Sequence, residues 1–140
     1  MRYHQSNITV RFNEVDAYQV AWHGHYLSWM EVGRCALSLQ FGLDPFQLGK
    51  LGYIAPVVAL EMKYLHPARY NDELTLFTRV RGADTATLIF ESIIRDSQGK
   101  KLAVGLTTHA LTDMEGVLQF HLPPEVAERI QSMRSWLEAA

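Results

Sequence analysis

The chain has 140 residues, of which 48% are hydrophobic and 20% charged, with 13 basic and 15 acidic side chains and a net charge of −2. This composition excludes a disordered chain, and the length is sufficient for a buried core. Because positive and negative charges nearly balance, the charge gives no reason to expect binding to nucleic acid. No stretch approaches the roughly 20 apolar residues of a membrane-spanning helix, so a membrane is not expected as a partner either.

The first predicted elements are a strand over residues 6–12 and a long helix over residues 23–41, separated by a segment without clear periodicity. The helix is apolar on more than one side, so we expect other elements to enclose it. Gly42 is placed to cap its end. Residues 42–56 are rich in glycine and proline and are predicted to form a loop. The apolar positions behind these predictions are Ile8, Val10 and Phe12 in the strand, and Tyr26, Met30, Gly33 and Leu37 in the helix.

The pattern becomes strand-like after residue 56, with turns predicted at 82–84 and 97–100. Gly105 indicates a bulge or a close approach of the backbone to another element. A helix is predicted near 124–138, because proline stands at its start and apolar residues follow at helical spacing. The predicted strands cover residues 57–66, 73–81, 85–95 and 101–112, with a short edge strand at 117–121, and the apolar residues of the last helix are Val126, Ile130, Met133 and Leu137.

These elements predict an α+β fold, in which a curled antiparallel sheet wraps around one long central helix. No repeat or linker divides the chain, so a single domain over residues 1–140 is expected. Its one cysteine, Cys35, cannot form an internal disulfide and is interpreted as a small core residue. The N-terminus, MRYHQSNITVRF, lacks the apolar core of a signal peptide. We therefore expect a cytoplasmic protein.

Asp16 is an isolated carboxylate among apolar and aromatic residues, in the stretch RFNEVDAYQVAWHGHY. One interpretation is a turn residue, whose side chain accepts hydrogen bonds from the backbone. The other is a catalytic acid or base, since partial burial among such neighbours suits a carboxylate for that role. The residues alone leave both interpretations open.

The start of the long helix is a second candidate element of a site. Its first backbone N–H groups, near His23 and Gly24, have no partner within the helix and carry the positive end of its dipole. Such groups can stabilise a carbonyl oxygen on which negative charge develops. A metal interpretation of His23, His25 and Glu31 is weak, because their spacing does not match catalytic zinc signatures. No metal and no cofactor are therefore expected.

Two stretches resemble the 4-hydroxybenzoyl-CoA thioesterase-like family of acyl-CoA thioesterases, which have the hotdog fold. They are RFNEVDAYQVAWHGHYLSWMEVGR at 11–34 and PVVALEMKYLHPARYNDEL at 56–74. The resemblance implies that Asp16 acts as nucleophile or as general base on water, and that the backbone N–H of His23 is an oxyanion donor. Glu31, two turns further along the helix, is the reserve candidate for the catalytic acid, since some hotdog thioesterases use a helix glutamate there.

The resemblance also leads to candidate substrate contacts. An acyl pocket could be lined by aromatic and apolar residues that equally suit the core or a subunit interface: Tyr18, Trp22, Tyr26, Met30 and Ile54. Many relatives have glycine at the position of Gln19. Some also carry arginines at the turn before the fourth strand, where residues 82–87 of this chain have no positive charge. CoA phosphates would then depend on other cations, for which Arg69, Arg79, Arg81 and Lys101 are the candidates, or the carrier would be a protein-bound phosphopantetheine.

The predicted function is hydrolysis of an acyl-CoA or aroyl-CoA thioester, with CoA as part of the substrate. A homodimer or homotetramer follows from the resemblance. Two alternatives remain at this stage. One is a thioesterase that acts on an acyl group carried by acyl carrier protein, and the other is a non-catalytic acyl-CoA-binding or interaction module.

Overall fold

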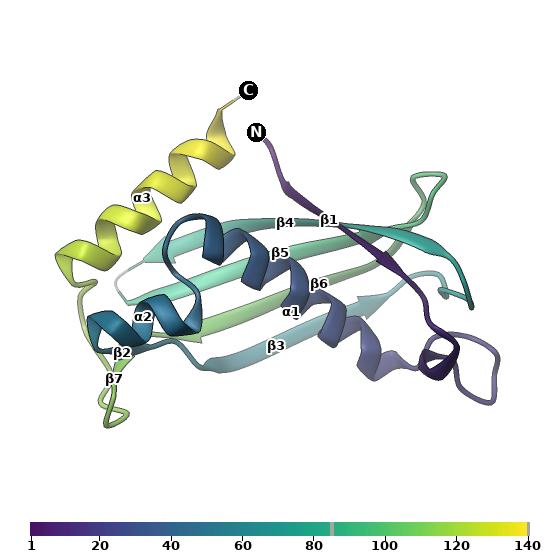
Figure 1. The fold of residues 1–140 in the computed structure, drawn as a ribbon, viewed down its shortest axis with the longest axis horizontal. Helices are drawn as coiled ribbons and strands as arrows, with labels where there is room; N and C mark the ends of the chain where they lie inside the picture. Colours follow the sequence, from purple (N-terminus) through teal and green to yellow (C-terminus); the bar gives the residue numbers. More distant parts are fainter. Residues whose placement is uncertain (85, 140) are drawn as a thin grey trace.

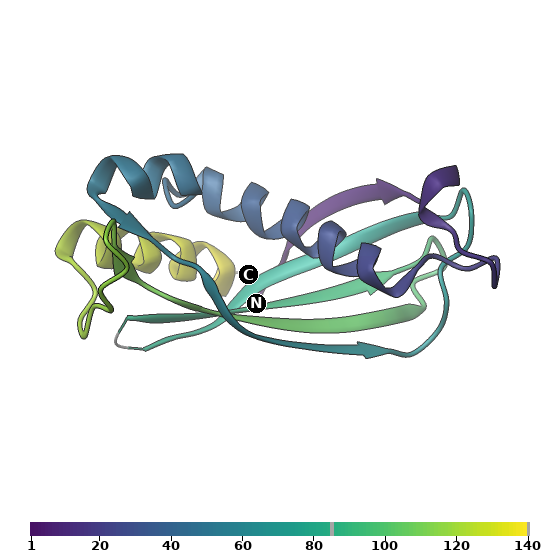
Figure 2. The same ribbon diagram turned by 90° about the horizontal axis from the view of Figure 1, so that it is seen from below.

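A computed structural model describes residues 1–84 and 86–139. Figure 1 shows a five-stranded antiparallel sheet in the order β1-β4-β5-β6-β3, crossed on one face by the long helix α1. The curled sheet seen from the side in Figure 2, with α1 lying over its concave face, confirms the predicted α+β hotdog architecture. The elements are β1 (His4–Thr9), the 3₁₀ helix η1 (Phe12–Glu14), α1 (His23–Gln40), α2 (Pro45–Leu51), β2 (Tyr53–Ile54), β3 (Val57–Tyr64), β4 (Glu73–Asp84), β5 (Thr87–Arg95), β6 (Lys101–Ala110), β7 (Thr112–Asp113) and α3 (Pro124–Glu138).

Helix α1 buries the predicted apolar face against the sheet. Tyr26, Met30, Gly33 and Leu37 are all buried, together with Trp29. The opposite side of α1 is open, because Val32 and Leu39 are 48% and 55% exposed. Within one chain the sheet therefore covers one side of α1 and does not enclose it, so the expectation of a helix enclosed on most sides is not met. Helix α3 is confirmed with its four predicted apolar residues buried.

The first strand was predicted too far along the chain. β1 runs from His4 to Thr9, and the chain then enters η1, where Phe12 is 80% exposed. Ile8 and Val10 point toward the core as expected. Phe12 does not, because the Glu14 N–H donates to the carbonyl of Arg11 and turns the chain out of the strand.

The loop predicted over residues 42–56 is wrong, since it contains α2 and β2. The side chain of Asp44 caps the start of α2, Pro45 occupies its first position, and Gly52 ends it with φ 91°. All three are ordinary helix-boundary signals. A helix of seven residues is too short to show a clear apolar period, so these signals were the only ones available in the sequence.

Two strand ends also differ from prediction. The turn predicted at 82–84 is wrong, because β4 continues to Asp84 after a register irregularity between Val80 and Gly82. Thr85, the first residue of the strand predicted at 85–95, lies outside the described residues, and β5 begins at Thr87. The edge strand predicted at 117–121 does not form, because after the turn at Asp113 to Gly116 only Leu118 pairs, in an isolated bridge to Thr112.

The two glycine predictions in the later strands are largely confirmed. Gly99 has φ 81° in the turn between β5 and β6. Gly105 pairs in register with Met62 and Ser92, so it marks no bulge. It marks a close approach instead, because a Cβ atom there would collide with the Met30 side chain.

Gly33 is a point of close contact between α1 and β4. A Cβ atom at Gly33 would lie 2.5 Å from Thr78 Oγ1, in a fully buried side chain. We expect Gly33→Ala to lower the free energy of unfolding by about 1–3 kcal/mol, because overpacking outweighs the better helix propensity of alanine. Gly49→Ala in α2 is the matched control, since nothing lies within 4 Å of its Cβ position. That control should be neutral or stabilising by up to about 1 kcal/mol in denaturant unfolding, and equal effects of the two changes would contradict the packing argument.

Candidate active site

The loop before α1 is a tight, hydrogen-bonded hairpin that carries Asp16. Val15 and Ala21 form an antiparallel bridge, and the Asp16 N–H donates to Val20 O at 2.9 Å. The Gln19 N–H donates to Asp16 O at 2.9 Å, which closes a turn, and Gln19 itself has φ 65°. This left-handed backbone explains physically why glycine suits that position, since a side chain there is strained.

This turn accounts for the hydrogen bonding of one of the two carboxylate oxygens of Asp16. Its Oδ1 accepts a hydrogen bond of 2.8 Å from the Tyr18 N–H, as expected of a turn aspartate. None of the residues that the structure describes donates to its Oδ2. One oxygen of Asp16 therefore orients the carboxylate, and the other is available for chemistry.

Helix α1 begins beside this loop with uncapped N–H groups. Trp22 is the N-cap and offers no side-chain hydrogen bond, so the N–H groups of His23 and Gly24 have no acceptor from their own helix. The Trp22 ring lies over Gly24 and would collide with a Cβ atom there. The Tyr64 hydroxyl, from the end of β3, donates to His23 O at 2.7 Å and holds the first turn of α1 in place.

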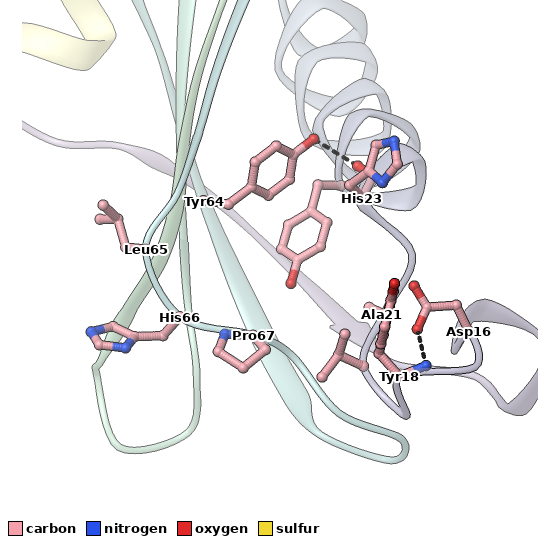
Figure 3. A pocket seen from close by; sticks show the side chains of 10 residues that line it. Asp16, Tyr18, Ala21, His23, Tyr64, Leu65, His66 and Pro67 are labelled. Atoms are coloured by element: carbon pink, nitrogen blue, oxygen red, sulfur yellow. Dashed lines mark hydrogen bonds between the residues drawn. The ribbon is translucent and has the colours of Figure 1, made fainter.

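One open cavity of about 360 Å³ brings these elements together (Figure 3). Asp16 and His23 line it from the loop and from the start of α1, and Tyr64 to Pro67 line it from the end of β3. Burial raises the pKa of the Tyr26 and Tyr64 phenols, so both hydroxyls stay protonated near neutral pH. The full lining is Asp16, Tyr18, Val20, Ala21, His23, Tyr26, Tyr64, Leu65, His66 and Pro67.

A family model described as the thioesterase-like superfamily matches residues 10–130. The chain belongs to this superfamily. The predicted class of enzyme, a thioester hydrolase, is thereby confirmed at the level of the family.

Individual relatives agree with this assignment. "Putative acyl-CoA thioesterase YneP" of Bacillus subtilis (strain 168) is 28% identical over 115 residues, which is 82% of this chain and 83% of that protein. A DHNA-CoA thioesterase structure from Staphylococcus aureus has a TM-score of 0.84 at 22% identity and covers 100% of this chain and 98% of its own. The protein SAV2348 from S. aureus, solved in complex with CoA, has a TM-score of 0.88 at 12% identity and covers 99% of this chain and 88% of its own. At these identities the two structures support the fold.

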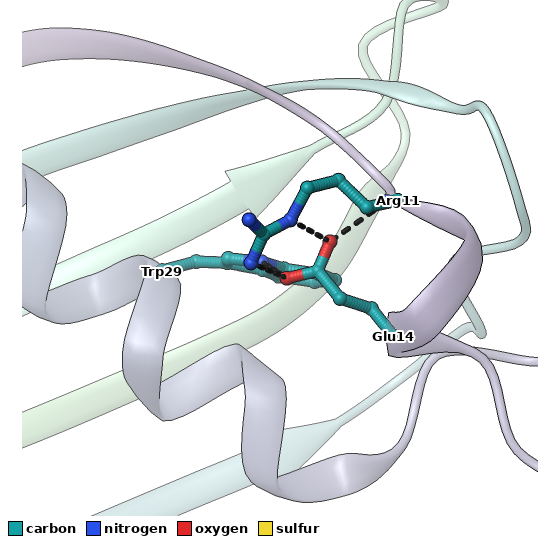
Figure 4. A network of polar contacts seen from close by, with 3 residues as sticks. All are labelled: Arg11, Glu14 and Trp29. Atoms are coloured by element: carbon teal, nitrogen blue, oxygen red, sulfur yellow. Dashed lines mark hydrogen bonds and ion pairs between the residues drawn. The ribbon is translucent and has the colours of Figure 1, made fainter.

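Sequence reasoning missed a buried carboxylate that anchors the Asp16 loop of this thioesterase. Glu14 is 3% exposed, and Figure 4 shows it held between Arg11 and Trp29. It accepts from the Arg11 N–H at 2.7 Å and from the Trp29 indole N–H at 2.9 Å, with the Arg11 guanidinium 3.3 Å away. The carbonyl of Glu14 also accepts from the Trp22 N–H. The network thus joins the base of the loop to the buried face of α1.

The Glu14 network predicts an acid-dependent stability. Burial by itself raises the pKa of Glu14, but the hydrogen bonds from Arg11 and Trp29 and the charge of Arg11 outweigh it and hold the pKa below its ordinary value of 4.5. The unfolded chain therefore takes up the proton more readily, so this stabilisation is present above about pH 4.5 and is lost as pH falls through the folded-state pKa.

We expect Glu14→Gln to lower the free energy of unfolding by about 1–3 kcal/mol at pH 7, because the hydrogen bonds to a buried charge are weakened. Denaturant unfolding from pH 7 to pH 3 should show the gap between wild type and variant narrowing only below about pH 4.5. A gap that stays constant down to pH 3 would contradict a carboxylate that is ionised in the folded chain.

The remaining predicted site residues of this thioesterase are distributed over the molecule. Tyr18 and Tyr26 line the Asp16 cavity, and Trp22 stands beside it with its ring 5.0 Å from that of His23. Met30 is buried in the core and Ile54 lines a second cavity. Glu31 pairs with Arg34 further along α1. Arg69 and Arg81 are exposed, and neither lines the Asp16 cavity.

Two further observations concern metals and membranes. Among residues 1–84 and 86–139, no three side chains of His, Cys, Asp or Glu gather as metal ligands do. No helix in the described part of the chain has the length and apolar character needed to cross a membrane.

Proposed function

We propose that this thioesterase hydrolyses an acyl-CoA or aroyl-CoA thioester at the cavity that contains Asp16. The observation that carries the proposal is that one cavity is lined both by a carboxylate with a free oxygen and by the first residue of an uncapped helix. These groups bring a nucleophile or base and an oxyanion site to the wall of one cavity, and attack on a carbonyl requires both.

Asp16 acts in this proposal as nucleophile or as general base. As a base, Oδ2 takes a proton from water while the water oxygen attacks the thioester carbon. As a nucleophile, Oδ2 attacks that carbon, and water later hydrolyses the mixed anhydride. In either route the C–S bond breaks, the CoA sulfur leaves and takes up a proton that water supplies, and the products are the free acid and the CoA thiol. The hydrogen bond from Tyr18 to Oδ1 supports both routes, because it holds the attacking oxygen in one orientation.

The N–H groups of His23 and Gly24 receive the developing oxyanion. They are directed out of the helix start, where the dipole favours negative charge, and no side chain of the N-cap competes for them. The bond from Tyr64 to His23 O supports this role, since it fixes the orientation of the first turn from a neighbouring strand. Glu31, which faces Arg34, becomes the reserve candidate only if Asp16 proves dispensable.

CoA is the proposed carrier, and the CoA complex of the SAV2348 structure supports it. Arg69 is exposed and follows the cavity-lining Pro67 by two positions in the sequence, so it is the first candidate for a contact with the CoA phosphates. Arg81 is a weaker candidate, because it is further along the chain from the residues that line this cavity. We propose further that the chain is a homodimer or homotetramer. The support is β3, an edge strand whose Val58 and Leu60 are 61% and 46% exposed.

The test is thiol release from a panel of short, long and aryl acyl-CoAs, run with the wild-type chain and with Asp16→Asn. Hydrolysis by the wild type that is lost in the variant supports the proposal. The same acyl group presented on acyl carrier protein decides the alternative carrier. Tight CoA binding without thiol release, over the whole panel, would indicate a non-catalytic binding module instead.

A further inference from the structure

A second cavity, of about 280 Å³, lies between the C-terminal half of α1 and the inner face of the sheet. It shares no residue with the Asp16 cavity. Along α1, Tyr26 of the first cavity and Arg34 of the second are separated by about 12 Å, at 1.5 Å per residue. Most of its wall is apolar, and the apolar residues come from several elements and the connections between them. They include Leu43, Leu48, Ile54, Val57, Leu88 and Phe90.

Of the three polar side chains in this wall, His109 is fully engaged. It is 1% exposed, and its Nδ1 donates to Ala55 O at 3.0 Å, because a carbonyl can only accept. Its Nε2 then accepts from the Thr107 hydroxyl at 3.0 Å. Burial lowers the pKa of His109, so the imidazole is neutral near pH 7. Both ring nitrogens are thus occupied, and His109 offers a ligand no charge.

Arg34 is different, because its hydrogen-bonding capacity is not filled. It is the one formally charged side chain among the described residues that line this cavity. One nitrogen, Nη2, pairs with Glu31, whereas the buried Nε–H has no acceptor in the described part of the chain. A buried donor without an acceptor is rare in folded proteins and indicates a missing partner. The side chain is only 17% exposed, so solvent does not supply that partner freely.

We propose that this cavity binds a free carboxylic acid with an apolar body. The carboxylate accepts hydrogen bonds from the guanidinium of Arg34, which matches a planar two-oxygen acceptor, and the apolar body lies against Leu43, Leu48 and Phe90. The carboxyl-bearing end faces α1, where Ser38 offers a second polar contact. The site does not depend on the proposed hydrolysis, although acids of this class are what that reaction would release.

Isothermal titration calorimetry at pH 7 with octanoate and with methyl octanoate tests the proposal. Octanoate is expected to bind once per chain, and Arg34→Gln is expected to weaken it by about 10- to 100-fold through loss of the charged donor. Methyl octanoate should bind the wild type more weakly than octanoate does, and its affinity should change little in Arg34→Gln. If octanoate does not bind, or binds wild type and Arg34→Gln equally, the proposal is overturned.

Two more variants separate this site from the Asp16 cavity and from loss of fold. Ile54→Trp leaves Arg34 in place and fills the cavity from a position that is 39% exposed, so it should fold and abolish octanoate binding. Asp16→Asn should leave octanoate binding unchanged. Binding lost in Asp16→Asn and retained in Ile54→Trp would assign the acid to the first cavity and overturn the proposal. Thioester turnover that persists in Asp16→Asn would count against the proposed function alone.

Discussion

Replacing Asp16 with asparagine is expected to reduce thiol release from the preferred acyl-CoA by about 10²- to 10⁴-fold. Asparagine keeps a side-chain oxygen that can accept from the Tyr18 N–H, so the turn at the base of the loop is retained. It loses the charge and the basicity that attack on the thioester carbon requires. The change therefore separates the two interpretations of Asp16, because a residue that only closes a turn would tolerate it. Steady-state thiol release gives the rate, and denaturant unfolding shows whether the fold is kept.

Asp16→Glu is the control for position. It restores the carboxylate but moves it by one methylene group, and misplacement by about 1 Å is enough to cost around 10²-fold in rate. Glutamate should therefore recover little of the activity. Turnover near that of the wild type in Asp16→Asn would demote Asp16 to a structural residue, and Glu31→Gln would be the next variant to measure.

Replacing His23 with proline is expected to reduce kcat by about 10²- to 10³-fold, the usual effect of losing one oxyanion donor. His23 is the first residue of α1, where proline is favoured and where its missing N–H breaks no helical hydrogen bond. Trp22 already has φ −61° and ψ 138°, which is the backbone that a residue before proline prefers. The carbonyl that accepts from Tyr64 is retained. The substitution thus removes the proposed donor while leaving the helix intact.

His23→Ala is the matched variant, because it removes the imidazole and its contact with Trp22 but keeps the backbone N–H. We expect it to retain most of the wild-type kcat. Circular dichroism and thermal unfolding of both variants show whether α1 is preserved. If alanine and proline lower kcat equally, the imidazole or the packing of Trp22 is responsible, and the backbone donor is not.

The elements with a long and regular period could be predicted from the sequence. The boundaries of α1 and α3 and their buried faces follow from apolar residues that recur every three or four positions, and β5 follows from strict alternation. The short elements could not. A seven-residue α2 has too few turns to show a period, and β1 was shifted because Phe12 continues the alternation of Ile8 and Val10 while its backbone turns away.

For the candidate site, the sequence by itself determined the part that is built from residues close together in the chain. Asp16 in a turn and the uncapped start of α1 at His23 both depend on residues that are close neighbours in the chain. Only the tertiary structure decided which distant groups complete each site. Tyr64 lies 41 positions after His23, and the indole that holds Glu14 comes 15 positions later, from the buried face of α1. Likewise, Arg34 and His109 meet at one cavity only because β6 lies beneath α1. Periodicity and capping are local properties of the backbone, whereas a partner across the sheet is set by strand order and helix packing, which no short stretch encodes.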